Sequence, residues 1–399
     1  MTKGPGVARI SLPQGFFASG INCGVRRYRP DLGIIISDRP AVGVGVFTLN
    51  QCKAAPVVYS CKQLPSPKIR AIITNSGQAN AATGHLGIEY NLKMVSCVAK
   101  ILGCNQDQVL AASTGVIGQQ LEIDKIVEAI PELISRQGTT AESFALSILT
   151  TDLVPKTVSI EIFLSGGPVK ITGICKGSGM IHPNMGTMLG YFLTDAVLSC
   201  EMAQKLLTKA NDHSFNMISV DGESSTNDCA FLLANGASGL ELISDTDVQL
   251  FSKALDDISI FLAQSIARDG EGATKLIEVV LNGAPSLELA RKVARGLVVS
   301  PLVKTAIHGE DPNWGRILAR LGADGAPSHC LEKMALSIQG SLLFQAGMPV
   351  NGDLKTLRGR LKDDTVNIHI DLNSGSHSAV AWGCDLSSKY VQINAEYMT

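Results

Sequence analysis

The sequence predicts an α+β protein built as a layered sandwich. Two observations lead to this fold class. β-rich runs, apolar throughout or alternating with a period of two, occur along the whole chain of 399 residues, and segments with helical periodicity lie between them. The strands and helices do not alternate strictly, which argues against a doubly wound parallel sheet.

The β-rich runs define the expected strands. Glycine, serine or asparagine turns separate two pairs of these runs, so we expect 157–164 with 169–174, and 366–372 with 378–382, to form antiparallel hairpins. The expected strands are 32–37, 41–47, 71–75, 157–164, 169–174, 188–193, 276–281, 334–338, 366–372 and 378–382.

Helical periodicity and capping signals define the expected helices. Ser244 precedes the longest helical pattern and is a plausible N-cap, whereas Pro131 interrupts another pattern. The Gly-Ala-Pro-Ser stretch at 283–286 is the best candidate for a boundary to a smaller C-terminal domain. The expected helices are 89–102, 123–136, 201–217, 246–268, 287–297 and 314–321.

Composition narrows the functional classes. Lysine and arginine number 34 against 36 aspartates and glutamates, so the net charge of −2 gives no electrostatic footprint for nucleic acid or for an anionic membrane. No apolar run approaches the length of a membrane span, and the N-terminus lacks the apolar core of a secretory signal. We expect a soluble cytoplasmic protein with neither nucleic acid nor membrane as a partner.

The ten cysteines are dispersed and show no C-x-x-C spacing, so the sequence predicts neither a metal site nor a redox motif. Cys175 lies beside a glycine-rich loop, but no clustered histidine accompanies it. We therefore expect the cysteines to be small buried hydrophobic residues in a reducing cytosol.

One dipeptide, Gly186-Thr187, has the chemistry of a self-cleavage site. A threonine hydroxyl is a weak nucleophile at neutral pH, and its own α-amine can serve as the base once the preceding peptide bond is cut. The hypothesis is that Thr187 Oγ attacks the Gly186 carbonyl, an ester forms by N→O shift, and water releases Thr187 as a new N-terminus. Spacing alone favours an ordinary glycine-rich loop entering a strand.

Two further segments carry candidate site residues. The Thr114 hydroxyl and the Gly115 N–H end an apolar run and are able to stabilise an oxyanion, although this motif taken alone favours an ordinary strand-terminating turn. Glu271, between two glycines, offers a carboxylate to an ammonium group, and a helix C-cap with a polar turn is an equally good interpretation of this segment. The polar run 221–228 lacks calcium-loop spacing and is interpreted as a hydrogen-bonded turn beside the site.

Several long segments in fixed order resemble the ornithine acetyltransferase (glutamate N-acetyltransferase) family of arginine biosynthesis. The resemblance covers nearly the whole chain and is far more specific than any single segment, so it reverses the preference for an ordinary loop at Thr187. The matching segments are 46–50 with 54–57, 75–80, 176–189, 224–228, 268–275, 311–318 and 390–399.

This resemblance implies a fold, a cleavage and a set of roles. It implies an α-β-β-α layered sandwich of the autoprocessed threonine-nucleophile type, cut into an α-chain 1–186 and a β-chain 187–399 that assemble as an α₂β₂ heterotetramer. Thr187 would be the nucleophile, with Thr114 and Gly115 as the oxyanion hole. The residues implied to hold substrate are Lys176, Glu271, Asn394, Thr399 and one of Thr150 and Thr151.

The implied reaction is ping-pong acetyl transfer from N-acetylornithine to glutamate through an acetyl-threonine enzyme, without a cofactor. Acetyl-CoA is a candidate second acetyl donor, and the sequence leaves this point open. Two alternatives are also open: an amidase or aminopeptidase of the same threonine chemistry in which water is the acceptor, and an uncut, non-catalytic binding protein. Gly186 stands where the family usually has alanine.

Overall fold

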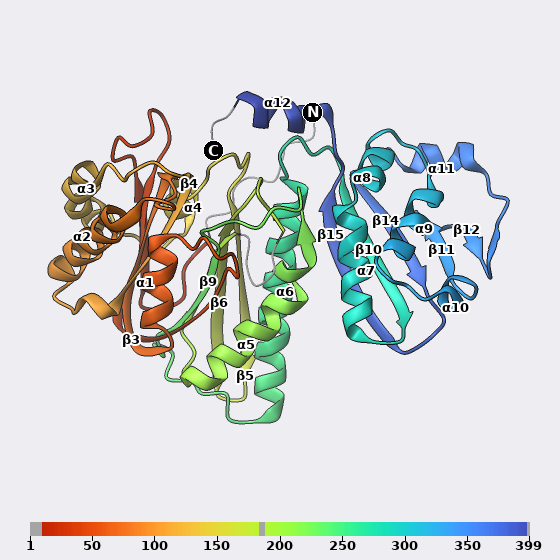
Figure 1. Ribbon diagram of the computed structural model, residues 1–399. Helices are drawn as coiled ribbons and strands as arrows, with labels where there is room; N and C mark the ends of the chain where they lie inside the picture. The colour runs from red at the N-terminus through yellow and green to blue at the C-terminus, as the bar shows by residue number, and fades with distance from the viewer. Residues whose placement is uncertain (1–9, 183–187, 397–399) are drawn as a thin grey trace.

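The computed structural model describes residues 10–182 and 188–396, which form two β-sheets with helices packed on them (Figure 1). The first sheet has the strand order β4-β3-β2-β9-β7-β6-β5, and β1 pairs with β2 beside this path. The strands are β1 (Phe16–Ile21), β2 (Leu32–Phe47), β3 (Ser66–Gln78), β4 (Val109–Val116), β5 (Lys156–Leu164), β6 (Gly167–Lys176), β7 (Leu189–Thr194) and β9 (Cys229–Ala234).

Strand β2 is a single 16-residue strand where the sequence predicts two. Its first part pairs with β1 and its second part with β9, and between them lie three exposed residues, 38–40. The pairing with β3 shifts register between Ile36 and Ala41. The polar break therefore marks an irregularity at which the backbone continues as a strand.

The two parts of this sheet face each other across a shared apolar cluster. Ile35 and Ile72 belong to the same buried cluster as Tyr191 and Phe231, although they come from opposite parts of the strand order. The hydroxyls of Thr74 on β3 and Tyr191 on β7 lie 2.8 Å apart across this interior.

Helices cover both outer faces of the first sheet (Figure 1). Helices α2 (Gly84–Leu102) and α3 (Ile123–Ser135) pack on the side of β1–β4. Helices α5 (Cys200–His213) and α6 (Asp245–Arg268) pack on the side of β5–β7 and β9. The predicted cap of α6 is confirmed, because Ser244 Oγ accepts from Asp247 N. Helix α5 ends at His213, earlier than the predicted 201–217, and a short 3₁₀ turn at Phe215–Met217 follows.

The second sheet has the order β13-β12-β11-β14-β10-β15-β8. The strands are β8 (Ile218–Ser219), β10 (Leu276–Ala284), β11 (Ala335–Ile338), β12 (Ser341–Gln345), β13 (Met348–Pro349), β14 (Thr365–Asp371) and β15 (His377–Cys384). Helix α6 lies between the two sheets, packing on β5 and β6 on one side and on β15 on the other.

The prediction that 366–372 and 378–382 form a hairpin is wrong. Strand β10 lies between β14 and β15, pairing in parallel with the first and antiparallel with the second. The connecting loop passes around the end of β10, where Leu372 N donates to Asn282 O at 2.9 Å and Ser374 N to Gly283 O at 2.8 Å. Ile277, Val279 and Leu281 on β10 are buried, so insertion of this strand supplies the apolar centre of the sheet. The other predicted hairpin, β5–β6, is confirmed.

The expected boundary at 283–286 lies inside the second unit. This stretch joins β10 of the second sheet to α7 (Leu287–Val299), which packs on β10 and β15 of the same sheet. Ser286 caps α7 by accepting from Leu289 N, so the polar composition here reflects a helix start. Apart from the two-residue strand β8, the chain passes from the first sheet to the second earlier, at 269–275, between α6 and β10.

The remaining helices are short. They are α1 (Ala55–Gln63), α4 (Glu142–Ser147), α8 (Pro301–His308), α9 (Trp314–Ala323), α10 (Ser328–Leu331), α11 (Leu354–Arg360) and α12 (Ser388–Glu396). Helix α12 lies between the two sheets, at the top of the view in Figure 1. Among residues 10–182 and 188–396, no helix combines the length and apolar character that crossing a bilayer requires.

Candidate active site

A cavity of about 160 Å³ lies where the ends of β4 and β6 meet the 221–228 turn and helix α12. Its walls bring together residues that are far apart in the sequence. Seven of the residues predicted for the site line it: Thr114, Gly115, Thr150, Thr151, Lys176, Glu271 and Asn394.

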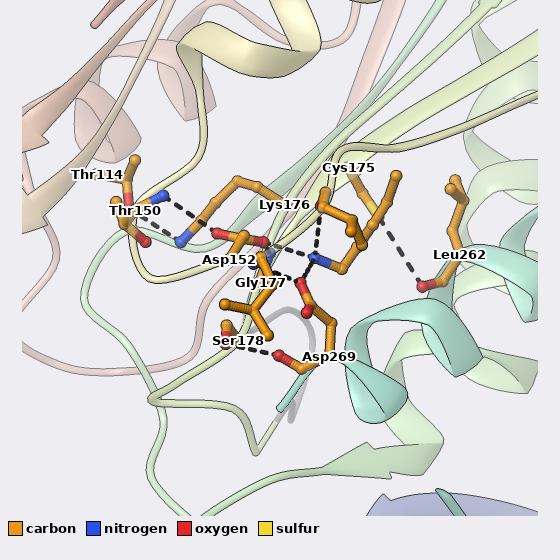
Figure 2. Close-up of polar contacts among 12 residues, drawn as sticks. Thr114, Thr150, Asp152, Cys175, Lys176, Gly177, Ser178, Leu262 and Asp269 are labelled. Carbon is orange, nitrogen blue, oxygen red and sulfur yellow. Dashed lines mark hydrogen bonds and ion pairs between the residues drawn. The ribbon is translucent and has the colours of Figure 1, made fainter. Parts of the chain in front are cut away.

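Thr114 and Lys176 form one wall of the cavity (Figure 2). Each is buried and stands at the end of its strand, and Lys176 Nζ donates to Thr114 Oγ1 at 3.3 Å. The next residue, Gly115, has φ +129°, and a Cβ placed there would lie 2.3 Å from the carbonyl carbon of Gly77. Only glycine allows this close approach of β4 to β3, which fixes the backbone beside the Thr114 hydroxyl.

A buried ionic network is centred on Lys156, and its two carboxylates, those of Asp152 and Asp269, are labelled in Figure 2. The Nζ of Lys156 contacts Asp152 Oδ1 at 2.7 Å and Asp269 Oδ2 at 2.6 Å. The same Asp152 oxygen accepts from Gly177 N at 2.7 Å, directly after Lys176. The network therefore joins the Thr150–Asp152 turn, the end of β6 and the end of α6 into one rigid support for the cavity.

Charge pairing decides the ionisation of this network. Burial alone would raise the pKa of Asp152, but the Lys156 and Lys176 ammonium groups outweigh it and lower that pKa to about 2. Burial would likewise lower the pKa of Lys156, and its two carboxylate partners reverse the direction and raise it. Both partners are therefore charged at neutral pH, despite their burial.

The stabilisation that Asp152 provides should disappear on acidification between about pH 4 and pH 2. The pKa of this carboxyl falls from its ordinary 3.8 to about 2 on folding, so the carboxylate favours the folded state above both values and loses this effect as the pH falls through 2. The shift corresponds to about 2 kcal/mol. Unfolding midpoints measured by circular dichroism should show Asp152→Asn well below the natural protein near neutrality, with the gap narrowing across this window. A gap that stays constant with pH would contradict the assignment.

Glu271 and Asn394 form the opposite wall. Glu271 follows α6, and its Oε2 accepts from Asn394 Nδ2 of α12 at 2.7 Å. A Cβ at Gly179 would lie 2.3 Å from the Glu271 carboxyl carbon, so glycine at 179 lets this buried carboxylate reach the cavity. The wall offers a carboxylate and an amide to a cationic ligand.

Known proteins resemble the chain over nearly its full length. The model of the ArgJ family matches residues 17–399. The chain belongs to the ArgJ family.

The relatives agree with this membership. The arginine biosynthesis bifunctional protein ArgJ of Oceanobacillus iheyensis is 45% identical over 393 residues, covering 98% of this chain and 96% of the relative. That of Dehalococcoides mccartyi is 46% identical over 395 residues, covering 98% and 97%. A crystal structure of the ArgJ protein of Bacillus halodurans is 40% identical and has a TM-score of 0.51, covering 53% of this chain and 100% of that chain. As an ArgJ family member, the chain is an acetyltransferase of arginine biosynthesis.

Three of the site residues expected from the resemblance, Gly186, Thr187 and Thr399, lie outside the described residues. Described residues on both sides of the expected cleavage site line the cavity. Ile181 precedes the expected cleavage site in the sequence, and Met188 and Leu189 follow it.

Sequence reasoning did not assign Asp221 and Tyr390 to the site of this ArgJ family member, and both line the cavity. Asp221 begins the turn that the sequence placed beside the site, so the segment was found but its first residue was not singled out. Tyr390 precedes Asn394 by one helical turn on α12, a spacing that places both on one face. Burial and the negative charges of Asp221 and Glu271 raise the pKa of Tyr390 to about 12, so its hydroxyl stays protonated.

Two residues near the cavity lack the properties of a nucleophile or a base. Cys175 is fully buried, and burial raises the pKa of its thiol, so it carries no thiolate at neutral pH. His182 is half-buried, and burial together with the charge of Arg295 lowers its pKa to about 4. It contacts Ser219 Oγ at 3.3 Å and Arg295 at 3.1 Å as a neutral imidazole.

Proposed function

We propose that this chain transfers an acetyl group from N-acetylornithine to glutamate in two half-reactions through an acetyl-Thr187 enzyme. The observation that carries the proposal is the cavity itself, which gathers a buried hydroxyl beside a glycine, a cation, and a carboxylate with an amide. These are the groups that acyl transfer between two α-amino acids requires.

The roles follow from the chemistry of each wall. Thr114 and Gly115 are the oxyanion hole, and the Lys176 ammonium contacting Thr114 Oγ1 at 3.3 Å adds positive charge where the oxyanion forms. Lys176 also suits the substrate carboxylate, while Glu271 and Asn394 suit the ammonium group. Thr399 and one of Thr150 and Thr151 complete the proposed binding set. No step calls for a cofactor.

The base is proposed to be the α-amine of Thr187 after self-cleavage. An α-amine titrates near pH 8, so about a tenth of it is neutral at pH 7 and is able to take the proton from Thr187 Oγ and return it to the departing ornithine. This requires separate chains 1–186 and 187–399, which we propose to assemble as α₂β₂.

Two observations support processing and the layered threonine-nucleophile fold. The Bacillus halodurans chain is matched over 100% of its length by 53% of this chain, so that solved chain is about half as long, as a product of cleavage would be. The apolar cluster between the two parts of the first sheet, with helices outside each, fits α-β-β-α layering.

The curated relatives are named bifunctional proteins, which supports a second acetyl donor, and we propose acetyl-CoA for this role. Release of CoA from acetyl-CoA in the presence of glutamate tests this activity separately from transfer between amino acids.

Ping-pong transfer predicts a stoichiometric burst. Mixed with N-acetylornithine alone, the enzyme should release about one ornithine per Thr187 and then stop, since no acceptor removes the acetyl group. Adding glutamate should restore steady turnover. Intact-mass spectrometry should show the burst as an acetyl group on the 187–399 polypeptide. Continued ornithine release without glutamate would identify the water-dependent amidase instead, and a single uncut, inactive chain would identify the binding protein.

A further inference from the structure

Residues 180–182, which precede the expected cleavage site, form hydrogen bonds with one short stretch of chain, residues 219–224. Both backbone polar groups of Ile181 are hydrogen-bonded. Its N–H donates to Asp221 Oδ1 at 2.9 Å, and its carbonyl accepts from Val220 N at 2.7 Å. The next carbonyl, that of His182, accepts from Ser224 Oγ at 2.9 Å.

Asp221 is the centre of this attachment. Its second oxygen accepts from Met180 N at 2.6 Å, so one carboxylate binds two consecutive backbone amides of the incoming segment. Met180 has φ +55°, a left-handed conformation that is unfavourable for a residue with a side chain. A charged acceptor on its N–H is what holds the strained backbone in this direction.

The rest of the protein fixes Asp221 in turn. Glu223 N donates to Asp221 Oδ1 at 3.2 Å. The preceding carbonyl, of Val220, accepts from the buried Lys304 Nζ at 2.6 Å, which ties the turn to helix α8. The chain on the other side of the cleavage site is held close by, since Cys229 N donates to Met188 O at 3.0 Å.

We propose that Asp221 is a positioning residue for self-cleavage. In that reaction Thr187 Oγ bonds to the Gly186 carbonyl carbon, the peptide C–N bond breaks, the hydroxyl proton passes to the released amine, and water then hydrolyses the ester. Asp221 takes part in none of these bond changes. Its carboxylate sets the path of the backbone at Met180 and Ile181, from which the chain runs to the reacting carbonyl. The inference rests on the proposed self-cleavage.

The test follows the full-length chain after cell-free synthesis and measures the rate of conversion to two polypeptides on denaturing gels. Asp221→Ala should slow conversion by about tenfold or more, because it removes a charged acceptor from two amides. Asp221→Asn keeps one acceptor oxygen, so its rate should lie between those of the natural chain and of Asp221→Ala. The matched control is Asp195→Asn, whose carboxylate also binds two distant backbone amides, those of Gln14 and Lys170, away from the cavity. It should process at the natural rate.

Hydroxylamine separates positioning from a general loss of structure. It cleaves esters and leaves amides intact, so it accelerates processing only where the ester has already formed. Asp221→Ala should remain slow in hydroxylamine while its circular dichroism matches that of Asp195→Asn. Natural-rate conversion, or rescue by hydroxylamine, would overturn the inference while leaving self-cleavage intact. A natural chain that is never cut would instead overturn the proposed function.

Discussion

Replacing Thr187 with alanine is expected to leave the chain uncut and without acetyl transfer. The substitution removes the hydroxyl that attacks the Gly186 carbonyl, and without cleavage no α-amine is freed to act as base. Both losses should be complete within detection, because none of the described residues that line the cavity would gain a free α-amine beside its own hydroxyl. Denaturing gels with intact-mass spectrometry report the first loss, and ornithine release from N-acetylornithine with glutamate reports the second.

Thr187→Ser is the matched control for this variant. It keeps a β-hydroxyl and should retain both cleavage and transfer at reduced rates. Cleavage between residues 186 and 187 in Thr187→Ala would show that the reaction is not intramolecular attack by this side chain.

Thr114→Ala should lower kcat roughly tenfold to a thousandfold while KM changes little. The Thr114 hydroxyl lies near the end of β4 and contacts Lys176 Nζ at 3.3 Å, and we propose that negative charge develops on the substrate carbonyl oxygen beside it in the transition state. A donor directed at this charge contributes more to the transition state than to bound substrate, which is why kcat carries the loss. Steady-state kinetics on processed enzyme, corrected for the fraction cleaved, measure it.

Thr114→Ser retains the donor and is expected to recover most of the rate. Because Thr114 is buried, the unfolding temperatures of both variants must also be compared. An unchanged kcat in Thr114→Ala would remove this hydroxyl from the oxyanion hole.

Local patterns predicted the fold where the structure depends on neighbours in sequence. The β5–β6 hairpin and the Ser244 cap of α6 form within a few residues, and both are confirmed. The arrangement of β14, β10 and β15 was not predicted, because strand β10 enters between two strands about 80 residues later in the chain. A short turn between two apolar runs indicates that the chain reverses direction. It does not show whether the two strands pair with each other or with a third strand that lies between them.

The candidate site was likewise predicted only in part from the sequence. Resemblance to the family indicated residues such as Lys176, Glu271 and Asn394, all of which line the cavity. Spacing alone favoured an ordinary loop after Lys176 and left the role of Glu271 open. Asp221 and the Lys156 network were not predicted as functional support. Their significance depends on contacts between segments that are remote in sequence, such as Lys156 with Asp269 at 2.6 Å. Periodicity and motif spacing carry no information on such contacts.

The order of strands in the first sheet determines how strongly the two polypeptides would remain associated after cleavage. Strands β7 and β9, which would belong to the second polypeptide, lie side by side between β2 and β6 of the first. Dissociation would have to open the β2–β9 and β6–β7 ladders at once and expose the interior on both sides. After cleavage, the two polypeptides would therefore remain associated through these two strand pairs. Once denatured, the two polypeptides would have to reassociate by diffusion, so refolding of the cleaved protein would depend on concentration, whereas refolding of an uncut chain would not.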